Sequence, residues 1–120
     1  LDIRYVPGDT DRILKNIRKI LPKRFAVDVI ANETALSTER GNEYIKILQK
    51  TAQQNLKKNI IIRGAQGTSD ARHFGKVKCA GIEFGPVGGG IGSDQEWVSL
   101  SSLETYREII KSFLLSLAKG

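Results

Sequence analysis

Apolar residues recur along this chain at two periods, one typical of helices and one typical of strands. Positions spaced three and four apart carry the apolar side chains in three segments, and this spacing predicts helices at residues 10–21, 42–57 and 101–117. Alternating or wholly apolar runs predict strands at residues 1–6, 25–31, 59–62 and 77–84. The order of these elements predicts a mixed α/β chain.

Polar residues at the ends of the predicted helices suggest where each helix begins and stops. Asp9 or Thr10 is placed to cap the first helix, and Pro22 stops it. Ser101, with Glu104 three residues later, has the spacing of a capping box and predicts the start of the last helix.

The predicted elements fall into two groups, separated by residues 32–41, which have no periodicity and several turn formers. We interpret this segment as a hinge between domains. Each group has too few strands for a sheet of its own, because central strands need neighbours to satisfy their backbone groups. Both groups therefore look like pieces of larger domains. The chain begins at Leu1 and has no methionine, from which we expect a longer parent polypeptide.

Composition narrows the classes of function. With 40% hydrophobic residues among 120, the chain is expected to bury a core, and no apolar run is long enough to span a bilayer. The net charge of +6 comes mostly from the middle of the chain. Those cations follow helical spacing without interleaved aromatic residues, so we expect a solvated helix face rather than a nucleic-acid or membrane surface. The single cysteine, Cys79, is expected to be a buried thiol, and a cytoplasmic location fits best.

Three segments in chain order carry a family resemblance. They are LDIRYVPGD at residues 1–9, GTSDARHF at residues 67–74 and IEFGPVGGGI at residues 82–91, the last followed by EWVS at residues 96–99 and an amphipathic helix. Together they resemble the zinc-dependent family that contains succinyl-diaminopimelate desuccinylase, acetylornithine deacetylase and aminoacylase.

The resemblance implies a catalytic α/β domain interrupted by a smaller lid that usually dimerises. It would make residues 1–36 the end of a split β-α-β lid, and residues 37–120 the C-terminal part of a three-layer catalytic domain. It also implies a metal-dependent amidohydrolase, with two zinc ions, that cleaves the amide bond of an N-acyl amino acid or small peptide. Most metal ligands would lie outside this chain, so the isolated chain is expected to be inactive and to hold no metal.

Five residues match positions that contact substrate in this family. Arg4 would hold a substrate carboxylate, since its planar guanidinium pairs both oxygens; a salt bridge to Asp2 or Asp28 is the alternative. Thr68 and Ser69 would offer hydroxyl and backbone donors to the carboxylate end. Arg72 is evenly balanced between a substrate acid and a salt bridge to Glu83 or Asp70. Gly89, in the glycine-rich loop, would let backbone approach the substrate closely.

One position departs from the family pattern. The family's last metal ligand is a histidine immediately after Ile91, where this chain has Gly92, which has no side chain to bind metal. The parent protein would need Asp94, Glu96 or His73 instead, use a single metal, or be a non-catalytic relative that keeps a substrate-binding or dimerisation role. His73 is the only histidine, and we expect it to be structural or solvent-facing.

Overall fold

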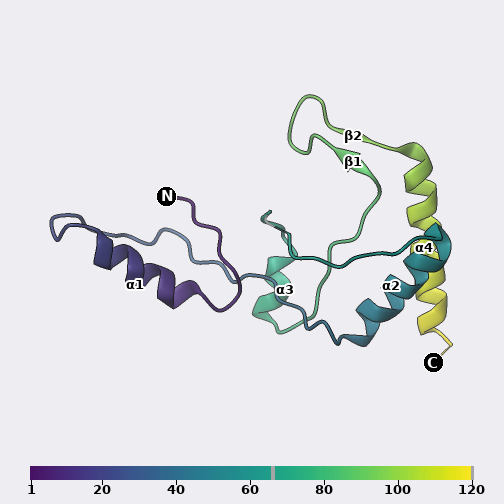
Figure 1. Cartoon of the computed structure of the whole chain (residues 1–120), viewed down its shortest axis with the longest axis horizontal. Coiled ribbons are helices and arrows are strands. Elements are labelled where there is room, and N and C mark those ends of the chain that lie inside the picture. The colour runs from purple at the N-terminus through teal and green to yellow at the C-terminus, as the bar shows by residue number, and fades with distance from the viewer. Residues whose placement is uncertain (66, 120) are drawn as a thin grey trace. The chain divides into compact units, whose positions relative to one another are not determined.

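The computed structural model describes residues 1–65 and 67–119, without the side chain of Thr10, and divides into two compact units. Residues 1–38 with 65–81 form the first unit, and residues 39–64 with 82–120 form the second. The elements are a mixture of helices and one two-stranded sheet (Figure 1). No helix within the described residues has the length and apolar character needed to cross a bilayer.

The first unit contains helices α1 (Thr10–Ile20) and α3 (Arg72–Lys76). Helix α1 begins after Asp9, as predicted, although the Asp9 carboxylate pairs with Arg12 at 3.0 Å and caps no backbone N–H. The helix ends at Ile20, and its C-cap Leu21 immediately precedes Pro22. The predicted apolar stripe of α1 is only half-buried, and Ile20 is 80% exposed.

The second unit is built on helices α2 (Glu43–Leu56) and α4 (Leu100–Leu117), which lie side by side (Figure 1). Leu48 and Ala52 of α2 pack against Ile109 of α4, which is 2% exposed. Asn42 caps α2 by accepting a hydrogen bond from the Ile45 N–H at 3.1 Å. The partly buried hydrophobic residues around this core are Leu56, Ile60, Phe84, Ile110 and Phe113.

Strands β1 (Gly88–Gly89) and β2 (Trp97–Val98) form an antiparallel hairpin in the second unit. Gly88 pairs with Val98 and Gly89 with Trp97. Two further bonds extend the contact toward α4, because the Ser99 N–H donates to the Val87 carbonyl and the Val87 N–H donates to the Ser102 hydroxyl, both at 2.9 Å.

The four predicted strands are wrong for the described residues of this structure. Residues 1–6, 25–31, 59–62 and 77–84 belong to no sheet. A strand is stable only when a neighbour accepts and donates its backbone hydrogen bonds, and the sheet that the structure describes is the hairpin of β1 and β2. The segments consequently remain irregular. Residue 77 instead follows the end of α3, a short helix that the sequence pattern did not predict.

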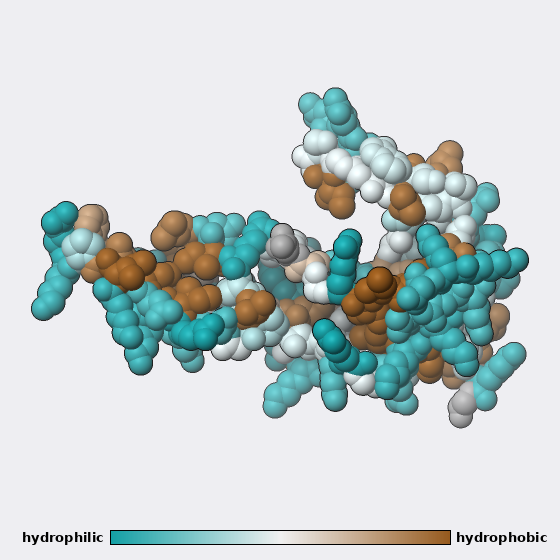
Figure 2. All heavy atoms as spheres, viewed as in Figure 1, coloured by the Kyte–Doolittle hydropathy of each residue, from teal (hydrophilic) through white to brown (hydrophobic). Residues whose placement is uncertain are grey.

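The absence of the four predicted strands also explains why the core and Cys79 differ from expectation. The core is smaller than expected, since the buried hydrophobic residues among those described are Leu48, Ala52 and Ile109. Cys79 is exposed rather than buried. Hydrophobic residues are consequently visible on the surface of both units (Figure 2). The apolar runs that suggested a larger core need a covering layer, which the described residues do not provide.

The N-cap of α4 also differs from the predicted one. Ser99, not Ser101, is the N-cap, and its hydroxyl accepts from the Ser102 N–H at 3.4 Å. The position three residues after this cap is Ser102 rather than a glutamate, so the capping box predicted for Ser101 and Glu104 does not form.

Candidate functional site

The segment from Gly67 to Arg72 forms a tight turn that leads into α3. The Ala71 N–H donates to the Ser69 hydroxyl at 3.1 Å, and the Arg72 N–H donates to the Ser69 carbonyl at 3.1 Å. Thr68 is exposed beside this turn, and the space where a side chain at Gly67 would lie is open. The turn therefore places three of the predicted substrate residues, Thr68, Ser69 and Arg72, within one short segment.

Arg72 is the best-anchored charged residue of this segment. Its Nη1 donates to the Ser69 carbonyl at 3.0 Å and to Asp70 Oδ1 at 3.1 Å. The Arg72 side chain is only 25% exposed, whereas Asp70 is 96% exposed. Arg72 Nε is buried and finds no acceptor among the described residues. Of the two partners considered from the sequence, Asp70 is the one that pairs, and a solvated carboxylate of this kind is easily displaced by another anion.

A second charged pair supports α3 from the linker, residues 32–41, that precedes α2. Lys76 Nζ lies 2.7 Å from Glu33 Oε2, with both side chains about half-exposed. The hydrogen bond and charge of Lys76 lower the pKa of Glu33, and His73 and Arg72 add smaller effects in the same direction. Glu33 and Lys76 lie 43 positions apart, and no feature of the sequence pointed to either.

Arg4 lies in the same unit, near the N-terminus. Its Nη2 is 3.6 Å from Asp2 Oδ2, and both side chains are largely exposed. This is one of the two salt bridges considered from the sequence.

Gly89 lies in the second unit, within the hairpin. A Cβ built there would be 2.8 Å from Trp97 Nε1, so the indole ring lies against the backbone of β1. Trp97 itself is 55% exposed. The predicted substrate residues are thus divided between the units, with four in the first and Gly89 in the second.

Gly92 lies in the turn between β1 and β2, and its φ is +77°. Its N–H donates to Glu96 Oε2 at 3.2 Å. No other atom lies within 4 Å of the position that a Cβ would take, so the site has room for a side chain. The left-handed backbone, however, strains most residues with a Cβ.

The residues present do not fit a zinc site. Across residues 1–65 and 67–119, no group of three or more His, Cys, Asp or Glu side chains is close enough to hold a metal ion. His73 is exposed on α3, as expected for a structural or solvent-facing histidine. Glu96, one of the replacement ligands considered, accepts a hydrogen bond from the Gly92 N–H instead.

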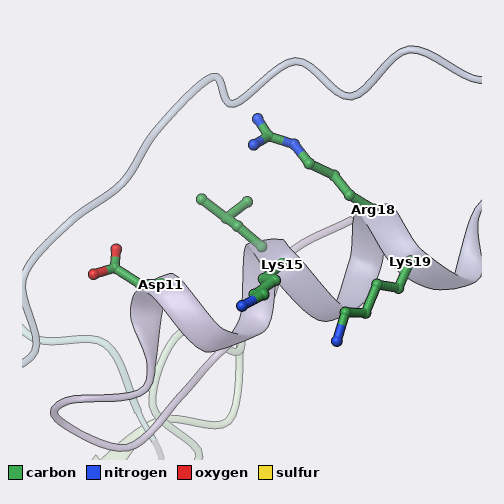
Figure 3. A pocket seen from close by; sticks show the side chains of 5 residues that line it. Asp11, Lys15, Arg18 and Lys19 are labelled. Carbon is green, nitrogen blue, oxygen red and sulfur yellow. The ribbon is translucent and has the colours of Figure 1, made fainter.

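A shallow hollow on α1 lies away from all of these residues in the sequence. It encloses about 410 Å³ and is lined by Asp11, Leu14, Lys15, Arg18 and Lys19 (Figure 3). All five side chains come from one helix, as Figure 3 shows, so the hollow is a gap between long surface side chains. We assign no function to it.

Comparison with known proteins identifies the family. The family model of peptidase family M20/M25/M40 matches residues 5–116, which is most of the chain. Searches of curated proteins and of solved structures found no match. The match supports a hydrolase of the metallopeptidase kind, and members of this family are generally metal-dependent. The chain therefore belongs to peptidase family M20/M25/M40.

Proposed function

We propose that this chain is the C-terminal portion of a metal-dependent amidohydrolase that cleaves the amide bond of an N-acyl amino acid or small peptide, as succinyl-diaminopimelate desuccinylase does. Family membership over residues 5–116 supports the reaction class. The narrower substrate class rests on the resemblance of the GTSDARHF segment and on the position of Arg72.

The role of this portion would be to hold the substrate's carboxylate. Arg72 carries the proposal, because its guanidinium is held by the Ser69 carbonyl while its ionic partner Asp70 is almost fully solvated. A substrate carboxylate can replace Asp70 at low cost, and the guanidinium fork can then pair both of its oxygens. The Ser69 and Thr68 hydroxyls lie in the same segment and would supply neutral donors.

A carboxylate-binding test uses the 120-residue chain and two small probes. N-acetylglycine carries both an amide and a carboxylate, whereas acetamide lacks the carboxylate. We expect N-acetylglycine to shift the NMR amide signals of residues 67–76 and acetamide to leave them unchanged. Arg72→Met should abolish the response to N-acetylglycine. Equal binding of both probes, or binding unaffected by Arg72→Met, would overturn the proposal.

The zinc chemistry would belong to the parent polypeptide, with most metal ligands outside this chain. When bound, zinc would activate water for attack on the amide. No step is assigned to a metal held by these residues, because the described side chains do not fit one. Hydrolysis by the parent that is lost on chelation and restored by zinc or cobalt would support an enzyme.

One observation favours a second candidate, a non-catalytic substrate-binding or dimerisation module derived from the same family. Gly92 replaces the histidine expected at the last metal-ligand position, and its N–H already bonds to Glu96. This candidate predicts binding of N-acetylglycine without metal-dependent hydrolysis by the parent. A homodimer through residues 1–36 would accompany either function and can be tested by sedimentation.

A further inference from the structure

Contacts between the linker and α3 fix the position of a helix that is too short to be stable alone. Helix α3 has five residues and no side-chain cap, and isolated helices of this length do not persist in water. Its last residue, Lys76, pairs with Glu33 at 2.7 Å. At Gly75 the two backbones approach closely, since a Cβ there would be 3.4 Å from the Ala35 carbonyl oxygen.

Three further hydrogen bonds tie the linker to its surroundings in the same unit. The Thr38 hydroxyl donates to the Gly81 carbonyl at 2.6 Å and accepts from the Gly81 N–H at 2.9 Å. The Tyr5 hydroxyl donates to the Glu33 carbonyl. The backbone of Glu33 is therefore held independently of its carboxylate. The carboxylate remains available to pair with Lys76.

Two cations lie on α3. Arg72 and Lys76 are within its five residues, and the carboxylate of Asp70 is almost fully solvated. Glu33 pairs with Lys76 at the end of α3, while Arg72 lies at its beginning. The pKa of Glu33 is lowered mainly by Lys76, with smaller contributions from His73 and Arg72, so the carboxylate is charged at neutral pH.

We propose that Glu33 is a positioning residue for the carboxylate-binding segment: by pairing with Lys76 it fixes α3 and leaves the Arg72 guanidinium for the substrate. This inference rests on the proposed function of Arg72. Glu33 itself contacts no substrate and acts through Lys76 and the orientation of the helix. The alternative role is purely electrostatic, and it predicts the opposite effect on binding. Removing a nearby negative charge would then free Lys76 as a second cation and strengthen anion binding.

The test compares Glu33→Gln with a charge-swapped chain in the 120-residue protein. Glu33→Gln removes the charge and keeps the shape, whereas the double variant Glu33→Lys/Lys76→Glu restores an ion pair of reversed polarity. Glu39→Gln makes the same change of charge in the other unit and serves as the control. The readouts are hydrogen exchange of the α3 amides without ligand, and NMR titration with N-acetylglycine.

We expect Glu33→Gln to speed exchange of the α3 amides by up to roughly fivefold, the range that a half-exposed ion pair allows. It should also weaken N-acetylglycine binding, and the charge swap should restore both properties while Glu39→Gln changes neither.

Unchanged or tighter binding by Glu33→Gln, or no rescue by the swap, would overturn the inference. If binding depends on Arg72 but not on Glu33, the positioning role alone fails. If the wild-type chain does not prefer N-acetylglycine to acetamide, the proposed function fails and the inference fails with it.

Discussion

The carboxylate of Glu96 accepts a hydrogen bond from the Gly92 N–H, with Oε2 and N 3.2 Å apart. Ser93 closes the same turn, because its N–H and hydroxyl both donate to the Gly90 carbonyl, at 2.9 and 2.7 Å. Its hydroxyl also accepts from the Gln95 N–H at 3.2 Å. The turn is thus ordered by its own polar groups. A glycine at 92 suits it, since the φ of +77° is costly for other residues.

Gly92→Ala should destabilise the chain by about 1 kcal/mol, because a Cβ is strained in the left-handed region. Gly92→Asn should cost less, since asparagine tolerates this backbone. Gly85→Ala is the matched control, as Gly85 also faces open space but without a left-handed φ. The urea midpoints of the three variants check the prediction. An equal loss for Gly92→Ala and Gly85→Ala would show that the backbone at 92 is not strained.

Gly92→His should not create a zinc site in the 120-residue chain. The new imidazole would have Glu96 nearby, but the described part of the chain holds no group of three His, Cys, Asp or Glu side chains for it to join, and zinc requires about four ligands. Titration calorimetry with zinc should give the same weak binding for Gly92→His, Gly92→Asn and wild type. Zinc binding markedly tighter in Gly92→His alone would refute this and would identify ligands that the present structure does not bring together.

The start of α4 can be tested at two serines. Ser99→Ala should destabilise the chain by about 0.5–1 kcal/mol, because the Ser102 N–H loses its side-chain acceptor and keeps only the Ser99 carbonyl, at 3.1 Å. Ser101→Ala should have little effect, since its hydroxyl contacts only the Ser99 hydroxyl, at 3.0 Å, at an exposed position. Thermal unfolding followed by circular dichroism distinguishes the two. A larger loss of stability for Ser101→Ala than for Ser99→Ala would instead support the capping box predicted from the sequence.

The three longer helices could be predicted from this sequence, whereas the short helix α3 and the strands could not. The stripe of Leu48 and Ala52 on α2 and of Ile109 on α4 is local information, because helical hydrogen bonds form within one segment. A strand such as residues 59–62 needs a neighbour elsewhere in the chain, and its apolar pattern says nothing about whether that neighbour exists. Ser99 and Ser101 illustrate the remaining error, since either fits a cap pattern and tertiary contacts with Val87 decide between them.

The candidate site was only partly accessible from the sequence. Thr68, Ser69 and Arg72 are neighbours in the chain, so one motif identified all three. Glu33 and Lys76 are brought together by folding across 43 positions, and a lone glutamate in a polar linker carries no signal of its own. Whether Gly89 joins the other residues at one site stays a prediction, as it lies in the other unit.

Ile109 is the most sensitive position of the small core. It is 2% exposed and packs against Leu48 and Ala52, so Ile109→Ala should cost about 2–5 kcal/mol through lost burial and a cavity. Leu115→Ala, on the same helix but 54% exposed, should cost far less. Urea denaturation measures both. Because the core is so small, Ile109→Ala should abolish the cooperative transition, and a variant that still unfolds cooperatively near the wild-type midpoint would contradict this.

Glu33 should make the free energy of unfolding of the chain vary with pH in the acid range. Its pKa in the folded chain is lowered below the usual value near 4.5, chiefly by the hydrogen bond from Lys76, so the folded state binds this proton less readily than the unfolded state. The stabilisation by the pair is therefore fully present above about pH 4.5 and is lost as the pH falls through the lower, folded pKa.

Glu33→Gln lacks this contribution at every pH. We expect the difference in urea midpoint between wild type and Glu33→Gln to be constant near neutrality and to shrink in acid, with Glu39→Gln as the control for general charge effects. A difference that persists unchanged to the lowest pH would show that the glutamine substitution acts through something other than the ion pair with Lys76.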